Sequence, residues 1–90
     1  PLVATEFVGT SISSGGNGSP TFDGLDGLLR ENPCVQFHNR QRGYVRCTVT
    51  PSAWQSDYVV VPNVREQGGA ASLLTSYVVE AGKPGAKKAA

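Results

Sequence analysis

The chain has 90 residues. That is enough for at most one domain, and a domain of this size buries only about 60 to 65% of the surface that its unfolded chain exposes. Eight lysine and arginine residues nearly balance seven aspartate and glutamate residues, for a formal net charge of +1. This balance excludes polyanion binding by bulk charge, so we expect no nucleic-acid partner.

The first third of the chain predicts a strand, a loop and a short helix. Residues 2–12 alternate and are rich in β-branched side chains, which is typical of a strand, and residues 13–20 form a Ser/Gly/Asn loop. Ser19 as a cap and Pro20 in the first turn then predict a helix that ends before Asn32 and Pro33. Because the chain begins with Pro1 and enters a strand at once, we expect it to come from inside a longer protein.

The rest of the chain predicts mostly strands. Residues 34–37 and 44–50 read as a hairpin around Gly43, with Pro51 ending its second strand. After a bend at residues 52–54, residues 57–61 are a continuous apolar run that suits a strand buried on both faces. A Gly-rich connection at residues 62–71 leads to a last strand at 72–80, and residues 82–90 read as a flexible tail. Five strands and one helix make a mainly β fold.

The register of the predicted hairpin decides what the two cysteines can do. If Cys34 faces Cys47, then Phe37 faces Tyr44 and a cross-strand disulfide can form. A slip by one residue places Val35 opposite Cys47, which unites the apolar faces and separates the thiols. The sequence leaves both registers open.

Two segments could bind an anion. Residues 10–19 have the glycines and hydroxyls of an anion cradle before a predicted helix N-terminus, although a plain surface connection has the same composition. Residues 37–46 contain no acid, and Arg42 in them could contact a phosphate or buttress the fold. His38 is the only histidine, and Cys34 and Cys47 lack further ligands, so this chain cannot build a complete metal site.

The order of motifs along the chain resembles that of a known family. The motifs are EFVGTSISSGG at residues 6–16, ENP at 31–33, Asn39, QRGYVRCTVTP at 41–51, Trp54, DY at 57–58, VVE at 78–80 and KPG at 83–85. They are similar to the C-terminal end of PhoD-type alkaline phosphatases and of the related metal-dependent phospholipases D of actinobacteria. The resemblance covers about nine-tenths of the chain.

The resemblance implies a calcineurin-like metallophosphoesterase, an αββα sandwich with iron and calcium in its active site. Residues 1–81 would complete the β-sandwich, and residues 82–90 would be a tail. The metal ligands would lie in an upstream part of the same enzyme, which would be this chain's partner, and export by the twin-arginine pathway would make the enzyme secreted. The substrate would be a phosphate ester or a phospholipid, and this chain alone would be inactive.

The resemblance also places candidate site residues. The segment at residues 3–12 would return antiparallel to a strand that carries metal ligands, which would bring Thr10, Ser11, Ser13 and Ser14 to the rim of the metal centre. Arg42 is a secondary candidate. The family commonly has histidine where this chain has Cys34, and that change favours a disulfide with Cys47. The alternative from another class is a small secreted β-rich binding or regulatory module with an anion-binding Gly-rich loop.

Overall fold

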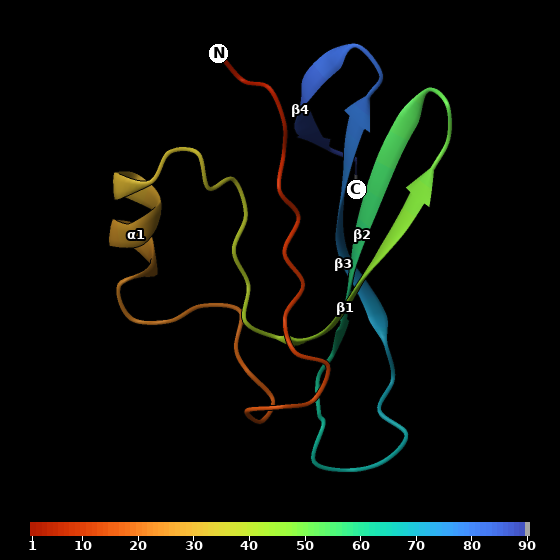
Figure 1. Ribbon diagram of the computed structural model, residues 1–90. Helices are drawn as coiled ribbons and strands as arrows, with labels where there is room; N and C mark the ends of the chain where they lie inside the picture. Colours follow the sequence, from red (N-terminus) through yellow and green to blue (C-terminus); the bar gives the residue numbers. More distant parts are fainter. Residues whose placement is uncertain (90) are drawn as a thin grey trace.

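The computed structural model describes residues 1–89, and an antiparallel sheet is its main element (Figure 1). In chain order the described elements are α1 (Leu25–Glu31), β1 (Arg42–Val49), β2 (Ala53–Val61), β3 (Ser72–Glu80) and β4 (Lys83–Lys88). The strands lie in the order β1-β2-β3-β4, and each is antiparallel to the next. The predicted class, mainly β with one short helix, is therefore confirmed.

Aromatic side chains attach the segment after the helix to the sheet. Tyr58 of β2 and Tyr77 of β3 contact Phe37, with ring centroids 5.1 and 5.8 Å from its own. Figure 1 shows α1 and the extended N-terminal segment on the same side of the sheet. This side of the sheet therefore carries a loose second layer made of loops and one helix.

The apolar core of the described residues is very small. Val59 of β2 is the one apolar side chain among them that is less than 9% exposed. In the N-terminal segment, by contrast, Val3 is 81% exposed and Ile12 is 68% exposed. Since burial of apolar surface is the main favourable term in folding, residues 1–89 lack the cover that such side chains normally have.

The strand predicted over residues 2–12 is wrong for this structure. The segment is extended, but within the described part of the chain its one backbone bond to another segment is from Gly43 N–H to Ser11 O, at 3.4 Å. A strand requires a ladder of such bonds with a neighbour, and no neighbouring strand pairs with this segment here.

The predicted helix begins later than expected. The Ser19 hydroxyl donates to the carbonyl oxygen of Thr21 instead of capping a helix, and α1 begins at Leu25 after Gly24, whose φ is 93°. The predicted end is confirmed, because α1 ends at Glu31 and Asn32 is its C-cap.

The predicted hairpin is also wrong, and with it both cysteine registers. Residues 34–40 are in a loop, and β1 pairs with β2, which places Cys47 opposite Ser56. Both cysteines are free thiols and exposed, so the Cys34–Cys47 disulfide that the resemblance favoured is absent. A turn at residues 50–52 joins β1 to the strand directly after it, and this short connection costs less loop entropy than the longer one that was expected.

Two other expectations have opposite outcomes. The last predicted strand is confirmed, since β3 spans Ser72–Glu80 as expected. The flexible tail is wrong for most of its length, because β4 pairs Lys87 with Val78 and Lys83 with Glu80. Gly82, with φ of 76°, makes the tight turn that lets β4 use the free edge of β3. Ala90, the last residue of the expected tail, lies outside the described residues.

Candidate anion-facing loop

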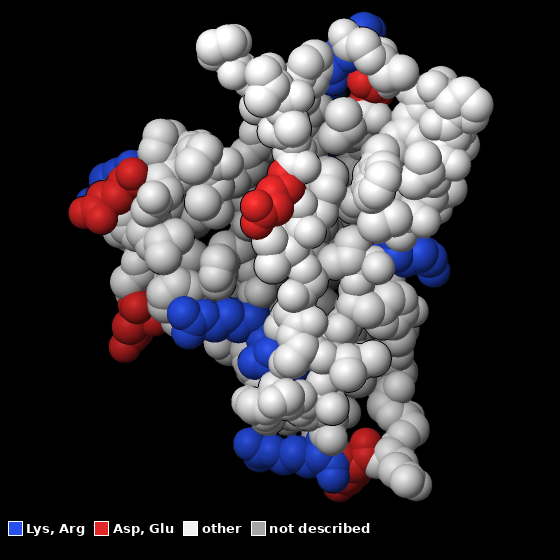
Figure 2. Space-filling view, in the orientation of Figure 1, with Lys and Arg blue, Asp and Glu red and all other residues white. Residues whose placement is uncertain are grey.

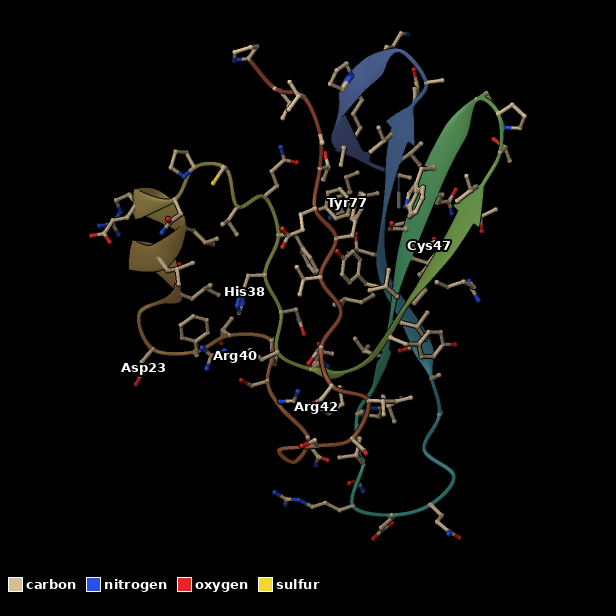
Figure 3. The ribbon with its side chains drawn as sticks, viewed as in Figure 1. Asp23, His38, Arg40, Arg42, Cys47 and Tyr77 are labelled. Atoms are coloured by element: carbon tan, nitrogen blue, oxygen red, sulfur yellow. The ribbon has the colours of Figure 1, made fainter. Side chains whose placement is uncertain are left out.

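Arg42, the first residue of β1, gathers the loop that the sequence singled out. Its Nη1 donates to Thr10 Oγ1 and to Ser11 Oγ, both at 2.7 Å, and its Nε donates to Gly16 O at 2.9 Å. Ser11 Oγ in turn donates to the carbonyl oxygen of Ser14 at 2.7 Å. Figure 3 shows Arg42 where β1 begins, beside the lower end of the N-terminal segment. The structure therefore joins four of the five predicted site residues in one network.

The same loop is attached at two further points. Arg40 N–H donates to Ser19 O at 3.0 Å, and Val64 N–H donates to Asn17 Oδ1 at 2.8 Å. Gly18, with φ of 67°, lies so close to Arg40 that a Cβ atom there would overlap the Arg40 carbonyl group. Residues 10–19 are thus held between the start of β1 and the connection from β2 to β3.

The basic side chains of residues 37–46 have different partners. Arg46 Nε lies 3.1 Å from Asp57 Oδ2, and Lys83 with Glu80 is the other ion pair among residues 1–89. Arg42 bonds to uncharged oxygens, and the Arg40 guanidinium lies 3.6 Å from the centroid of the Phe22 ring. Arg46 is therefore neutralised by an acid, whereas Arg40 and Arg42 keep their positive charge for solvent or a ligand.

His38 has a structural contact rather than a chemical partner. Its ring packs edge-on against Phe22 at a centroid distance of 5.1 Å, and Figure 3 shows it pointing toward the helical layer. Its Nδ1 atom is buried and has no hydrogen-bond partner among the residues that the structure describes. No acid or nucleophile within the described chain makes His38 part of a catalytic pair.

A buried carboxylate in the sheet was not predicted from the sequence. Asp57 is 5% exposed, and its Oδ1 accepts hydrogen bonds from Gln55 at 2.8 Å and from Ser76 at 2.6 Å. These bonds, with the adjacent Arg46, hold the pKa of Asp57 below its ordinary value of 3.8 even though burial acts in the opposite direction. Only the register, which places Asp57 opposite Arg46 and Ser76, could have revealed this cluster.

A cleft of about 900 Å³ opens beside the loop. Its walls are the N-terminal segment, residues 34–42 and the side of the sheet that carries Tyr58 and Tyr77. No group of three or more His, Cys, Asp or Glu residues lies together within residues 1–89. These residues do not fit a metal ion by themselves, and we derive no catalytic step through a metal from this chain. None of the described helices is long and apolar enough to cross a membrane.

The sequence that forms this sheet and loop matches a family of phosphatases. The family model described as PhoD-like phosphatase matches residues 1–58, and the chain belongs to this family. More particularly, the chain is 51% identical over 87 residues to alkaline phosphatase D of Bacillus subtilis (strain 168). That match covers 97% of this chain and 15% of the relative.

A solved structure, titled Structure of PhoD, matches with a TM-score of 0.86 and 51% identity, over 93% of this chain and 16% of that chain. The family expected from the motifs is therefore confirmed, and the fold fits a fragment of a larger one. The chain spans about one sixth of the length of these relatives. Assignment of Thr10, Ser11, Ser13, Ser14 and Arg42 to an active-site rim stays a prediction. Ser13 is exposed, and its hydroxyl has no hydrogen-bond partner within residues 1–89.

Proposed function

We propose that this chain is the C-terminal part of a secreted, metal-dependent phosphoric ester hydrolase that acts on phosphomonoesters or on phosphodiesters such as phospholipids. The observation that carries the proposal is the 51% identity to an alkaline phosphatase along almost the whole chain. Identity at this level over 87 residues supports a shared fold and a shared place in the enzyme. Iron and calcium, in this proposal, are bound by the upstream part.

The small core supports the view that this chain needs a partner. Val59 is its one buried apolar side chain among the described residues, and the extended N-terminal segment exposes Leu2, Val3 and Val8 by 58 to 81%. Unpaired strand backbone and exposed apolar side chains are the features that a neighbouring strand would satisfy. We propose that the upstream part of the same enzyme covers this segment, and that the chain alone is inactive.

The residues of this chain would act at the edge of the active site. Arg42 binds the hydroxyls of Thr10 and Ser11, whereas Ser13 and Ser14 are exposed and their hydroxyls make no hydrogen bond to a described residue. Exposed hydroxyls on a loop that is held in this way can donate hydrogen bonds to phosphoryl oxygens and orient the substrate. Metal ions, when bound in the upstream part, would supply polarisation of the phosphoryl group.

The test compares the full-length enzyme with this chain alone on para-nitrophenyl phosphate and on phosphatidylcholine vesicles, side by side. We expect the full-length enzyme to hydrolyse at least one substrate, to contain iron and calcium by elemental analysis, and to be inactive after chelation. Ser13→Ala should lower kcat/KM about ten-fold, since it removes about one hydrogen bond in the transition state. Ser52→Ala, at the exposed turn between β1 and β2, is the matched control.

Turnover by the isolated chain, or a full-length enzyme that cleaves neither substrate, would contradict the proposal. Equal effects of Ser13→Ala and Ser52→Ala would remove Ser13 from the active-site rim while leaving the hydrolase assignment intact.

A further inference from the structure

Two arginine side chains lie beside the loop at residues 10–19, and neither is paired with an acid within residues 1–89. Arg42 is half-buried. Its Nη2 lies near Gly15, because a Cβ atom built on Gly15 would be 3.8 Å from this nitrogen. Arg65, from the connection between β2 and β3, reaches the next residue: a Cβ added at Gly16 would lie 3.6 Å from its Nη2. Two guanidinium groups from different parts of the chain therefore flank two consecutive glycines.

No carboxylate neutralises these two groups. Residues 7–22 and 37–46 contain no acid. Glu66 follows Arg65 directly, yet neither arginine is in either of the ion pairs within residues 1–89. In Figure 2 the basic side chains are spread over the lower part of this face, where Figure 3 labels Arg40 and Arg42, with acidic groups beside the lowest of them and at the lower left, where Figure 3 labels Asp23. Basic groups therefore outnumber acidic ones around the loop, although the chain as a whole is nearly neutral.

The side chain of Arg65 makes no hydrogen bond or ion pair that would stabilise the fold of residues 1–89. It is exposed and makes no hydrogen bond to any described residue, since only its backbone N–H is bonded, to Asn63 Oδ1 at 3.0 Å. Arg42, by contrast, uses Nε and Nη1 to hold the loop, and its Nη2 has no hydrogen bond within residues 1–89. Gly15 and Gly16, which these two guanidinium groups flank, directly follow the exposed Ser13 and Ser14 in the chain. Guanidinium and hydroxyl donors on one loop match the oxygens of a phosphate or a carboxylate.

We propose that Arg42, Arg65 and the hydroxyls of Ser13 and Ser14 form a subsite for a second anionic group of the substrate. This group, a phosphate or a carboxylate, would belong to the same molecule as the ester that is cleaved. The inference rests on the proposed function, because it requires the loop to lie beside the active site. Its consequence is a preference for esters with an anionic leaving group over esters with a cationic group such as choline.

The competing explanation is that Arg42 only buttresses the loop. In that case the charge of Arg65, which holds nothing in place, has no influence on which substrate is cleaved. Arg65 is therefore the position that separates the two explanations, and its substitution leaves the Arg42 network untouched.

The experiment measures kcat/KM of the full-length enzyme for para-nitrophenyl phosphate and for para-carboxyphenyl phosphate, whose leaving group carries a carboxylate. Each variant is compared with the wild type on the same substrate, so the different reactivities of the two esters cancel. Arg65→Glu should lower kcat/KM for the carboxylated ester by about three- to ten-fold more than for the other, as expected for reversing one partly screened charge. Added salt should weaken this difference.

Lys87→Glu is the matched control, because Lys87 is also exposed and lies on β4, at the end of the sheet opposite to the β2–β3 connection in Figure 1. It should change both substrates equally, and Arg65→Lys should keep most of the preference. A third arm uses vesicles of phosphatidylinositol 4-phosphate, whose headgroup carries a second phosphate. An Arg65→Glu effect confined to vesicles would show a membrane contact and overturn the subsite.

The remaining outcomes are also decisive. If Arg65→Glu and Lys87→Glu change the two soluble esters equally, the subsite is refuted while the proposed function stands. If the wild-type enzyme cleaves neither soluble ester, the subsite is refuted, and the proposed function fails with it only if phosphatidylcholine is not cleaved either.

Discussion

Replacement of Arg42 by alanine is the sharpest test of how the loop is held. The substitution removes three hydrogen bonds, to Thr10 Oγ1, Ser11 Oγ and Gly16 O, and it leaves all three acceptors in place. Charged hydrogen bonds contribute about 1.5–3 kcal/mol each when buried, but Arg42 is half-exposed and its acceptors can bind water instead. We expect the loop to lose about 1–2 kcal/mol of stability against local opening.

The structure supplies reporters for this opening. The backbone N–H groups of Arg40, Gly43 and Val64 donate to Ser19 O, Ser11 O and Asn17 Oδ1, so they are protected only while the loop stays in place. Hydrogen–deuterium exchange of the full-length enzyme, followed by mass spectrometry, should show these amides exchanging about 5- to 30-fold faster in Arg42→Ala. Amides of β3 should be unchanged.

Arg30→Gln is the control for loss of one positive charge, because Arg30 is exposed in the last turn of α1 and makes no hydrogen bond or ion pair to the loop. It should leave the three reporter amides as they are in the wild type. Unchanged exchange in Arg42→Ala, or an equal increase in Arg30→Gln, would refute the claim that Arg42 holds the loop.

Three further predictions concern the sheet and α1. The pKa of Asp57 is lowered by folding, so its contribution to stability is complete above the unfolded pKa near 3.8 and is lost as the pH falls through the lower folded pKa. Denaturant midpoints measured between pH 6 and pH 2 should therefore fall less steeply in Asp57→Asn than in the wild type. An identical fall of the midpoint with pH in both proteins would contradict this prediction. Gly43→Ala should destabilise the protein by about 2–4 kcal/mol, because the new Cβ would overlap the Val59 carbonyl group, whose carbon is 2.9 Å away. Gly27→Ala should instead stabilise the protein by up to about 1 kcal/mol, because Gly27 lies inside α1 and no atom lies within 4 Å of the new Cβ. A lower thermal unfolding temperature for Gly27→Ala than for Gly43→Ala would contradict this steric argument.

Secondary structure was predicted correctly from the sequence where local signals determine it, and wrongly where it depends on which strand a segment pairs with. The C-terminal end of α1 and the bounds of β3 were predicted correctly, because they depend on the local signals of Asn32-Pro33 and of the alternation at residues 72–80. Residues 2–12 and 34–37 have the same alternation, yet neither is a strand among the described residues, since alternation does not say which neighbour a segment pairs with. Lysines and a proline made residues 83–88 resemble a tail, although such residues are also typical of a protected sheet edge.

The candidate site depends on the same information about pairing. Arg42 and Arg46 lie on one strand, four residues apart, and are indistinguishable by local sequence as candidates for an anion. The register of β1 with β2 separates them, because it places Asp57 opposite Arg46 and the apolar Val61 opposite Arg42. Arg46 is thus paired with an acid of the neighbouring strand, in a bond that also lowers the pKa of Asp57. Arg42 finds only hydroxyl and carbonyl oxygens, which orient its guanidinium without neutralising it. The pairing of β1 with β2 therefore makes Arg46 a structural residue and leaves Arg42 as a positive charge beside the loop that no acid within residues 1–89 pairs with.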